Sequence, residues 1–323
     1  MKIGTDQYNT FDTMTMDCWN DRVYYEGKEF PAGHFAAEIL NFAGVIHDPL
    51  LERITVLTAL VDDLSTAEKS KRHDIAAQLK PLLHDTVSWL YTCPPFCYCE
   101  SQSAYEDLEH ALSEERLDRD YEEGEAHLPY LALSFCEPIL RILVAIYNFC
   151  LLIRAFEKKY LRRAKRRNAD AFAKAAHECF DEDDSFLILL EQMPFGGVEE
   201  FFSYPRVITG FNYFQDENNE EKWKTAQRVI CKRAIDFYVF DLMNGLHHGH
   251  APSQCQGCGR YFLTTNGHIP KYCDGVAPQD SRYTCRQYGA MMHQKEQNKQ
   301  HPVYRLFNTR TDTIRKHHQR GKI

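Results

Sequence analysis

Four cysteines near the end of the chain have the residue type and the spacing of a metal site. Cys255 and Cys258 are separated by two residues, Cys273 follows after fourteen more, and Cys285 after another eleven. Zinc prefers four tetrahedral ligands in a structural site, and thiolates two residues apart can reach one ion from a single tight turn. The sequence therefore predicts one Zn²⁺ bound by these four thiolates, with no open position for catalysis.

The residues around these cysteines suit such a site. Gly257 and Gly259 give the first turn a permissive backbone, and the segment 260–262 after it is expected to continue as a strand. Cys273 is expected at the end of a hairpin, and Cys285 in the first turn of a helix, where the helix dipole favours a thiolate. Four unrelated buried thiols are the alternative, but so small a cysteine-rich segment would then lack the means to fold.

Other cysteines and histidines offer weaker sites. Three cysteines crowd one loop: Cys93, Cys97 and Cys99. With no fourth ligand close in sequence, a second metal or a redox pair competes with ordinary loop cysteines, and their role stays open. Three histidines precede the first cysteine pair: His247, His248 and His250. They either replace a cysteine ligand or close a helix C-terminus, where their partial charge suits the helix dipole.

The sequence contains no recognisable catalytic motif. A Gly-rich phosphate loop, a Gly-x-Ser-x-Gly elbow and a His-Glu-x-x-His pair are all missing from it. An enzyme whose active site is assembled from distant residues of the helical part therefore stays a hypothesis. It ranks third, after nucleic-acid binding and protein binding by the C-terminal segment.

Charge is distributed unevenly along the 323 residues. The whole chain has a formal net charge of -8, but residues 251–323 carry 12 Lys and Arg against 4 Asp and Glu, so the remainder is strongly acidic. A basic segment on an acidic body favours a polyanion as partner, although the two parts could also attract each other. The basic side chains proposed to contact phosphates are Arg305, Arg310, Arg315, Lys316 and Arg320.

Most of the chain has the periodicity of helices. Helices are expected from Pro49 to about residue 64, with apolar residues every three or four positions, and over 75–91, 103–120, 128–166, 168–192, 223–246, 284–300 and 303–318. The second of these contains Pro81, so it is expected either to be kinked there or to begin anew at that residue, and Pro302 separates the last two. A short hairpin is expected around Gly27, and a strand or hairpin over 204–214.

Together these patterns predict a mainly α protein. Residues 1–250 would form an acidic, mostly helical domain with a small β-hairpin, and residues 251–323 a basic four-cysteine module with a helical tail. The module is expected to be similar to a zinc ribbon or treble clef, followed by C-terminal helices.

The start of the chain bears on its location. Residues 1–19 contain three aspartates and no continuous apolar run, so we expect no secretory signal peptide and a cytoplasmic protein. Its 12 cysteines are then thiols or metal ligands rather than disulfides. The most apolar stretch, 139–156, is interrupted by Arg141, Asn148 and Arg154 and is expected to be a buried core helix, with no membrane partner.

The C-terminal pattern also resembles known families. The order Cys-x-x-Cys-Gly-Arg-Tyr-Phe, Tyr-Cys-Asp, Thr-Cys-Arg and basic helix, over about residues 225–318, resembles an uncharacterised bacterial family with a domain of unknown function. It is also distantly similar to the CGNR zinc fingers, a resemblance that implies zinc binding and contact with DNA. The chain departs from that pattern after Cys285, where it reads Arg-Gln-Tyr-Gly. This departure weakens the implication of DNA binding.

Two functional hypotheses therefore lead. In the first, the zinc module of an intracellular protein contacts nucleic acid in a regulatory role. In the second, zinc only shapes a surface that binds another protein or the chain's own acidic domain. The charge distribution alone supports both equally.

Overall fold

A computed structural model describes residues 13–42, 49–118, 121–123, 126–128, 130–164, 166–184, 186, 188, 206–216, 219–265, 267 and 270–321. The expectations for residues 1–12, for the helix cap at Asp48 and for the ends of the ranges 103–120 and 168–192 lie outside the described residues. The contacts divide the chain into an N-terminal unit, Met1–Ser253 with Leu263–His268, and a C-terminal unit, Gln254–Phe262 with Ile269–Ile323. Independent domains divided at residue 250 stay a prediction.

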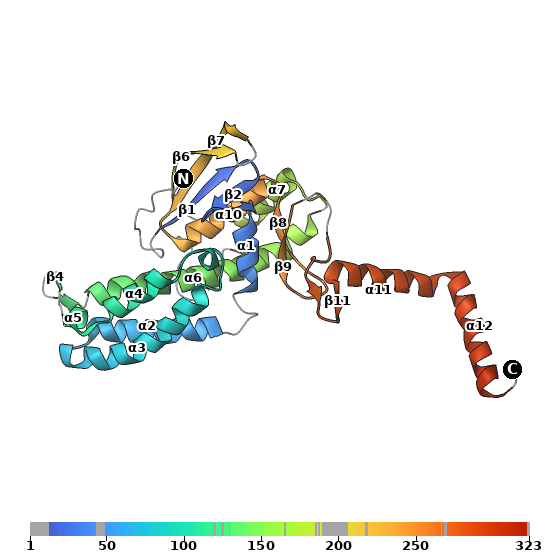
Figure 1. Cartoon of the computed structure of the whole chain (residues 1–323), viewed down its shortest axis with the longest axis horizontal. Helices are drawn as coiled ribbons and strands as arrows, with labels where there is room; N and C mark the ends of the chain where they lie inside the picture. The colour runs from blue at the N-terminus through green and yellow to red at the C-terminus, as the bar shows by residue number, and fades with distance from the viewer. Residues whose placement is uncertain are drawn as a thin grey trace. The chain divides into compact units, whose positions relative to one another are not determined.

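The N-terminal unit contains a five-stranded antiparallel sheet (Figure 1). Its strands are β1 (Met14–Trp19), β2 (Arg22–Tyr25), β3 (Lys28–Pro31), β6 (Val207–Asp216) and β7 (Asn219–Cys231). They lie in the order β3-β2-β1-β7-β6, so the first strand among the described residues pairs with a strand from the last third of the chain. Met16 lies opposite Val229 in this pairing, and both side chains are buried on one face of the sheet.

This sheet shows that the predicted fold class was wrong. The hairpin at Gly27 and the strand after residue 204 formed as expected, as β2–β3 and β6. The range 223–246, expected to be one helix, instead contains most of β7 followed by α10 (Ala234–His247). Strand β1 was not predicted at all. Strands β1 and β7 stabilise each other by pairing, although they lie far apart in the sequence. The local periodicity of either segment gives no sign of this pairing.

One face of the sheet packs against two helices. These are α1 (His34–Glu38), which continues into the turn η1 (Ile39–Asn41), and α10. Tyr25 of β2 contacts Phe35 of α1 and Phe237 of α10, with ring centroids 5.4 and 5.6 Å apart. Aromatic edge contacts of this kind add to the stabilisation from apolar burial. The core therefore lies between the sheet and these helices.

The middle of the chain is helical, as expected (Figure 1). It contains α2 (Pro49–Thr66), α3 (Lys69–Leu90), η2 (Phe96–Tyr98), α4 (Gln102–Ala111), α5 (Glu114–Leu117), β4 (Tyr121–Glu123), β5 (Ala126–Leu128), α6 (Tyr130–Lys159), η3 (Leu161–Arg163) and α7 (Ala169–Phe180). The apolar residues of α2 that recur every three or four positions are all buried, as the periodicity predicted: Leu50, Ile54, Leu57, Val61 and Leu64. Helix α3 runs through Pro81 without a break.

Helix α6 is long and apolar. Among the described residues, Ala132–Arg163 is the one helical stretch whose length and composition match a membrane span, and 56% of its most apolar window is buried inside the protein. A core helix of a soluble protein passes the same test, so this is weak evidence for a span. The helix packs against α2, α4 and α10. The burial of Ile139, Leu143 and Ile146 agrees with the expected core helix.

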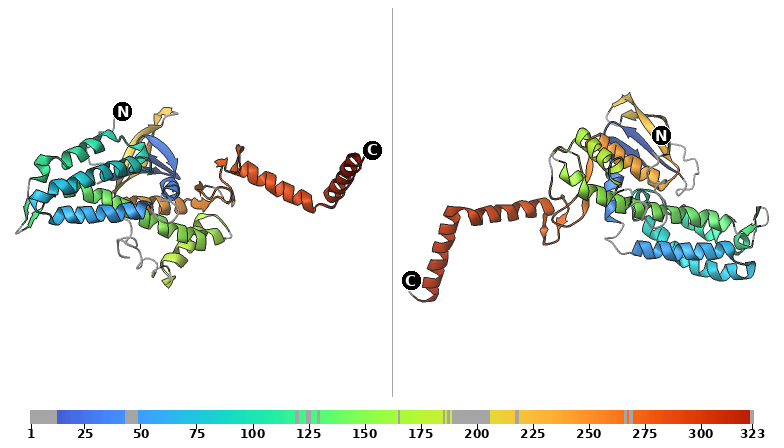
Figure 2. Two further views of the ribbon diagram at one scale, coloured as in Figure 1. Left: turned by 90° about the horizontal axis from the view of Figure 1, so that it is seen from below. Right: turned by 180° about the vertical axis from the view of Figure 1, so that it is seen from behind.

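The C-terminal unit has little sheet and two long helices. The short strands β8 (Ala251–Gln254) and β9 (Tyr261–Thr264) pair where the chain passes between the units, and β10 (Val276–Ala277) pairs with β11 (Asp280–Thr284). Helices α11 (Cys285–Gln300) and α12 (Pro302–Gln319) follow, and the break at Pro302 is where it was expected. The two helices meet at a sharp bend (Figure 2).

Candidate metal centre

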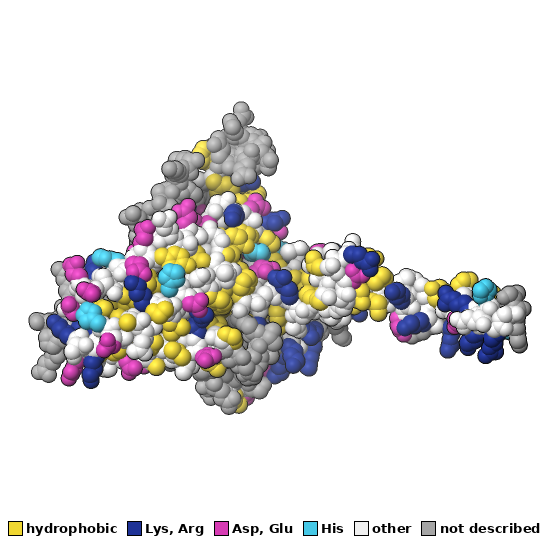
Figure 3. Space-filling model, turned by 60° about the horizontal axis from the view of Figure 1, so that its bottom comes forward, with side chains coloured by type: hydrophobic (Ala, Val, Ile, Leu, Met, Phe, Trp, Pro, Cys, Tyr) yellow, Lys and Arg dark blue, Asp and Glu magenta, His cyan; other side chains and the backbone are white. Residues whose placement is uncertain are grey.

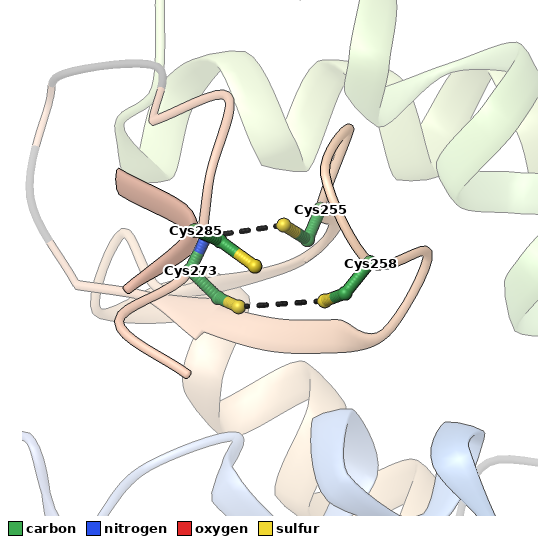
Figure 4. Close-up of side chains that lie close together, drawn as sticks. All are labelled: Cys255, Cys258, Cys273 and Cys285. Carbon is green, nitrogen blue, oxygen red and sulfur yellow. Dashed lines mark hydrogen bonds between the residues drawn. The ribbon is translucent and has the colours of Figure 1, made fainter. Parts of the chain in front are cut away.

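The structure brings the four C-terminal cysteines together. The Sγ atoms of Cys255, Cys258, Cys273 and Cys285 all lie within 4.8 Å of one another, and those of Cys258 and Cys273 are 3.6 Å apart. Their side chains point toward a common centre (Figure 4). Three of the four are buried, and Cys258 is half-buried. The arrangement is a compact cluster of thiols at the start of α11.

A tight turn between β8 and β9 positions the first two cysteines. The Cys255 N–H donates to the Arg260 carbonyl at 2.8 Å, and the Gly259 N–H donates to the Cys255 carbonyl at 2.9 Å. Gly259 has a φ of 75°, a left-handed conformation that glycine adopts without steric cost. The expected strand after this turn is present as β9. The Cys-x-x-Cys segment therefore forms a closed turn with both thiols on one side.

Backbone hydrogen bonds join the segment around Cys273 to the start of α11, where Cys285 lies. Cys285 is the first residue of α11, as expected; its N–H donates to the Gly275 carbonyl at 2.7 Å, and the Arg286 N–H donates to the Cys273 carbonyl at 3.1 Å. The helix begins with a capping box. The Gln287 N–H donates to Thr284 Oγ1 at 3.2 Å, and the Thr284 N–H donates to Gln287 Oε1 at 2.9 Å.

This capping box was missed in the sequence, although Thr-x-x-Gln is a recognised signature of a helix start. It fixes the first turn of α11 and thereby the position of Cys285.

The thiols differ in their electrostatic surroundings. Burial opposes ionisation of Cys255, but backbone N–H groups outweigh it and lower its pKa to about 7; Gly257 and Cys273 donate to its Sγ at 3.4 and 3.3 Å. Burial and the neighbouring thiols raise the pKa of Cys273 to about 11 and raise the pKa of Cys285 as well. Four thiolates would repel one another here unless a cation neutralised them, and a bound metal ion deprotonates such thiols.

Aromatic side chains also pack against the cluster. Phe262, Tyr272 and Tyr288 pack against the buried cysteines. The ring of Tyr272 lies directly on Gly289 of α11, where an added Cβ would come within 2.4 Å of it. Sequence reasoning missed this contact. A glycine inside a helix, where it is unfavourable, was the available signal.

The donor set fits one metal ion. Zinc–sulfur bonds of about 2.3 Å in a tetrahedron place the sulfurs about 3.8 Å apart, close to the separations in this cluster. Within the described residues, no other group of three or more His, Cys, Asp and Glu side chains has such geometry.

The loop cysteines and the histidines that the sequence offered as weaker metal ligands have other contacts in the structure. Cys93 is buried and Cys97 exposed, and the Cys99 thiol lies 3.3 Å from the Tyr25 hydroxyl. His250 donates Nδ1–H to the Ala32 carbonyl at 2.9 Å, and His248 closes the C-terminus of α10.

The five basic residues of the tail are exposed. They lie on α12 or directly after it, and none has an ion pair with a carboxylate anywhere in the described ranges. Elsewhere in this unit, Arg282 pairs with Asp280 at 2.7 Å and Arg286 with Asp274 at 3.0 Å. Successive side chains of a helix are rotated by about 100° around its axis. Arg305 and Lys316 therefore point away from Phe307, whereas Arg310 points to the same side as that ring. The cations therefore surround the helix rather than forming one stripe.

Comparison with known proteins adds one finding. A model described as "Family of unknown function (DUF6076)" matches residues 203–323, from β6 to the end of the chain. No curated protein matches the chain. No solved structure matches it either. The match includes the cysteine cluster and both tail helices but leaves out β1, β2 and β3, and it shows no similarity to the CGNR fingers.

Proposed function

We propose that the C-terminal unit is a structural zinc module that binds nucleic acid through its helical tail. Zinc is supported by the donor set, because four thiolates in a tetrahedral arrangement are typical of structural zinc. Iron is the other metal that four thiolates favour. With all four positions filled by protein, the ion would hold the turn, the loop and the start of α11 together without taking part in a reaction.

The observation that carries the nucleic-acid proposal is the set of exposed basic side chains on α12 and directly after it, which form no ion pair with a carboxylate of the described residues. Arg305, Arg310, Arg315, Lys316 and Arg320 are solvent-exposed, and the unit offers their helix few carboxylates (Figure 3). Cations that have no intramolecular partner are available to replace the counterions of a phosphate backbone. The metal-held start of α11 would give this tail a defined point of attachment.

A specific observation favours a second candidate, a protein partner. Five exposed hydrophobic residues accompany the cations on α12: Val303, Tyr304, Leu306, Phe307 and Ile314. Helical periodicity places all five on one half of the helix. An isolated helix with an uncovered apolar side suits a groove on an acidic protein.

Metal content tests the zinc proposal. Purified protein should contain about one equivalent of zinc per chain by mass spectrometry of metals, because four thiolates saturate one tetrahedral ion. Cys258→Ser and Cys285→Ser should each lose it. Cys97→Ser, at an exposed thiol of the Cys93–Cys99 loop, is the matched control and should keep the full equivalent. Full occupancy in both ligand variants, or iron in place of zinc, would contradict the proposal.

Salt dependence tests the nucleic-acid proposal. We would measure binding of the zinc-loaded chain to mixed-sequence duplex and single-stranded DNA at several salt concentrations. Replacing Arg310, Arg315 and Lys316 together with Ala should weaken binding to every sequence and reduce the slope of log K against log salt by about 2 to 3.

Replacing Arg282 and Arg286, which already pair with aspartates, is the matched control and should change the slope little. Absence of binding at low salt by a folded, zinc-loaded protein would exclude nucleic acid and leave the protein partner as the better account.

A further inference from the structure

The two edges of the five-stranded sheet differ in how well they are protected against pairing. Edge strand β3 has four residues and carries Lys28, Glu29 and Pro31, which are features that discourage another strand. Edge strand β6 has ten residues, from Val207 to Asp216, and its only charged residue is the last one. Within the described part of the chain, no strand lies beyond it (Figure 1). A long uncharged edge strand is suited to pairing with another chain.

The hairpin that contains this edge also exposes large aromatic side chains. Phe211 and Tyr213 of β6 are 72% and 65% exposed, and Trp223 of β7 is 64% exposed. The strand register places all three on one face, because Phe211 lies opposite Gln227, Tyr213 opposite Thr225 and Gln215 opposite Trp223. This is the same face that, nearer the other end of β7, buries Val229 and Cys231 against the core. The core-facing side of the sheet therefore continues past its covering helices as an exposed aromatic surface.

Charge and shape favour a second copy of this chain as the occupant. If two β6 strands pair antiparallel around Phe211, the two Phe211 rings meet, and Tyr213 of one copy lies opposite Thr209 of the other. No like charges face each other between residues 207 and 215. Gly210 has open space where a Cβ would be, so no side chain blocks close approach there. Aromatic cross-strand pairs of this kind stabilise antiparallel sheets.

We propose that the protein forms a two-fold symmetric dimer in which β6 of one copy pairs with β6 of the other, joining two five-stranded sheets into one. This symmetry makes the interface self-complementary, since each copy supplies the same edge and the same aromatic surface.

The proposal is tested by sedimentation velocity on the full, metal-loaded chain over a range of concentrations. The wild type should sediment with twice the mass of one chain. Phe211→Lys should raise the dimer dissociation constant by about a hundredfold, because two ammonium groups would meet at the symmetry axis. Phe307→Lys on α12 is the matched control: the same substitution at a ring that is 63% exposed should leave the dimer intact. If Phe211→Lys does not fold, as judged by circular dichroism, Thr209→Lys at another exposed position of β6 replaces it.

Hydrogen exchange provides a second readout. Backbone amides of residues 207–215 should gain protection as the wild-type concentration rises, and Phe211→Lys should abolish that gain. A wild type that stays monomeric, a dimer that forms without protection of β6, or a dimer that Phe307→Lys disrupts would each overturn the proposal.

Discussion

One buried carboxylate connects two helices beneath the sheet. Asp241 of α10 is fully buried and accepts the N–H of Gly33 on Oδ1 and the N–H of Ala36 on Oδ2, each at 2.9 Å. Burial raises its pKa to about 6, although these backbone donors act in the opposite direction. The side chain therefore satisfies two buried donors at the start of α1, at the expense of burying its own charge.

Asp241→Ala should destabilise the protein, because it leaves those two backbone donors without an acceptor. We expect a loss of about 2–4 kcal/mol in the free energy of unfolding, measured with a chemical denaturant. The folded pKa of Asp241 lies above the unfolded value, so its contribution to stability is largest at low pH and declines as pH rises from about 4 through about 6. The difference between wild type and variant should thus be larger at pH 5 than at pH 7.

The control for this prediction is Asp63→Ala, at an exposed carboxylate on α2. It should change stability little at either pH. A stability difference between wild type and Asp241→Ala that grows toward pH 7 would contradict the expected pH dependence.

At the scale of elements, the cysteine cluster depends on how closely α11 approaches the loop before it. Gly289 allows the ring of Tyr272 to lie against the helix, and the next residue along that loop is the ligand candidate Cys273. The capping box at Thr284 and Gln287 fixes the start of the same helix. Loop and helix are therefore positioned by packing and capping as well as by any metal.

A double-mutant cycle tests this contact. Ala is favoured over Gly inside a helix by about 1 kcal/mol, so Gly289→Ala would stabilise α11 if only helix propensity acted. Because the added Cβ meets the Tyr272 ring, we expect the substitution instead to destabilise the unit by about 1–3 kcal/mol and to weaken metal binding in a competition with a chelator. In a Tyr272→Ala background, Gly289→Ala should become neutral or stabilising. Equal effects in both backgrounds would show that the ring is not the cause.

At the scale of the whole molecule, the two units differ in how much apolar core they contain. The N-terminal unit has its sheet, its helical middle and most of the buried apolar residues. In the C-terminal unit, the core cluster among the described residues consists of three of the cysteines and Ala277. A unit whose core consists mainly of metal-ligand candidates relies on the metal for its folding free energy.

Metal removal should therefore affect the C-terminal unit first. After treatment with a strong chelator, limited proteolysis followed by mass spectrometry should show cleavage within the cysteine-containing segment, residues 254–285, before the N-terminal unit is cut. The metal-loaded protein, digested in parallel, is the control, and its cleavage should be confined to the exposed tail. Simultaneous digestion of both units after chelation would show that they unfold as one cooperative structure.

The sequence by itself determined those features that depend on neighbouring residues. The buried face of α2, the hairpin at Gly27, the break at Pro302 and the turn around Cys255 follow from helical periodicity and from the backbone preferences of glycine and proline. The spacing and chemistry of the cysteines also selected, from twelve, the four that the structure brings together.

Only the tertiary structure decided the sheet. Residues 223–231 have enough apolar positions to resemble a helix, and they became β7 because β1 and β6 pair with them on both sides. Likewise, Gly289 shows its importance only once Tyr272 is folded against it. The stabilising free energy of such contacts comes from residues far apart in the chain, and no local window of sequence contains both partners.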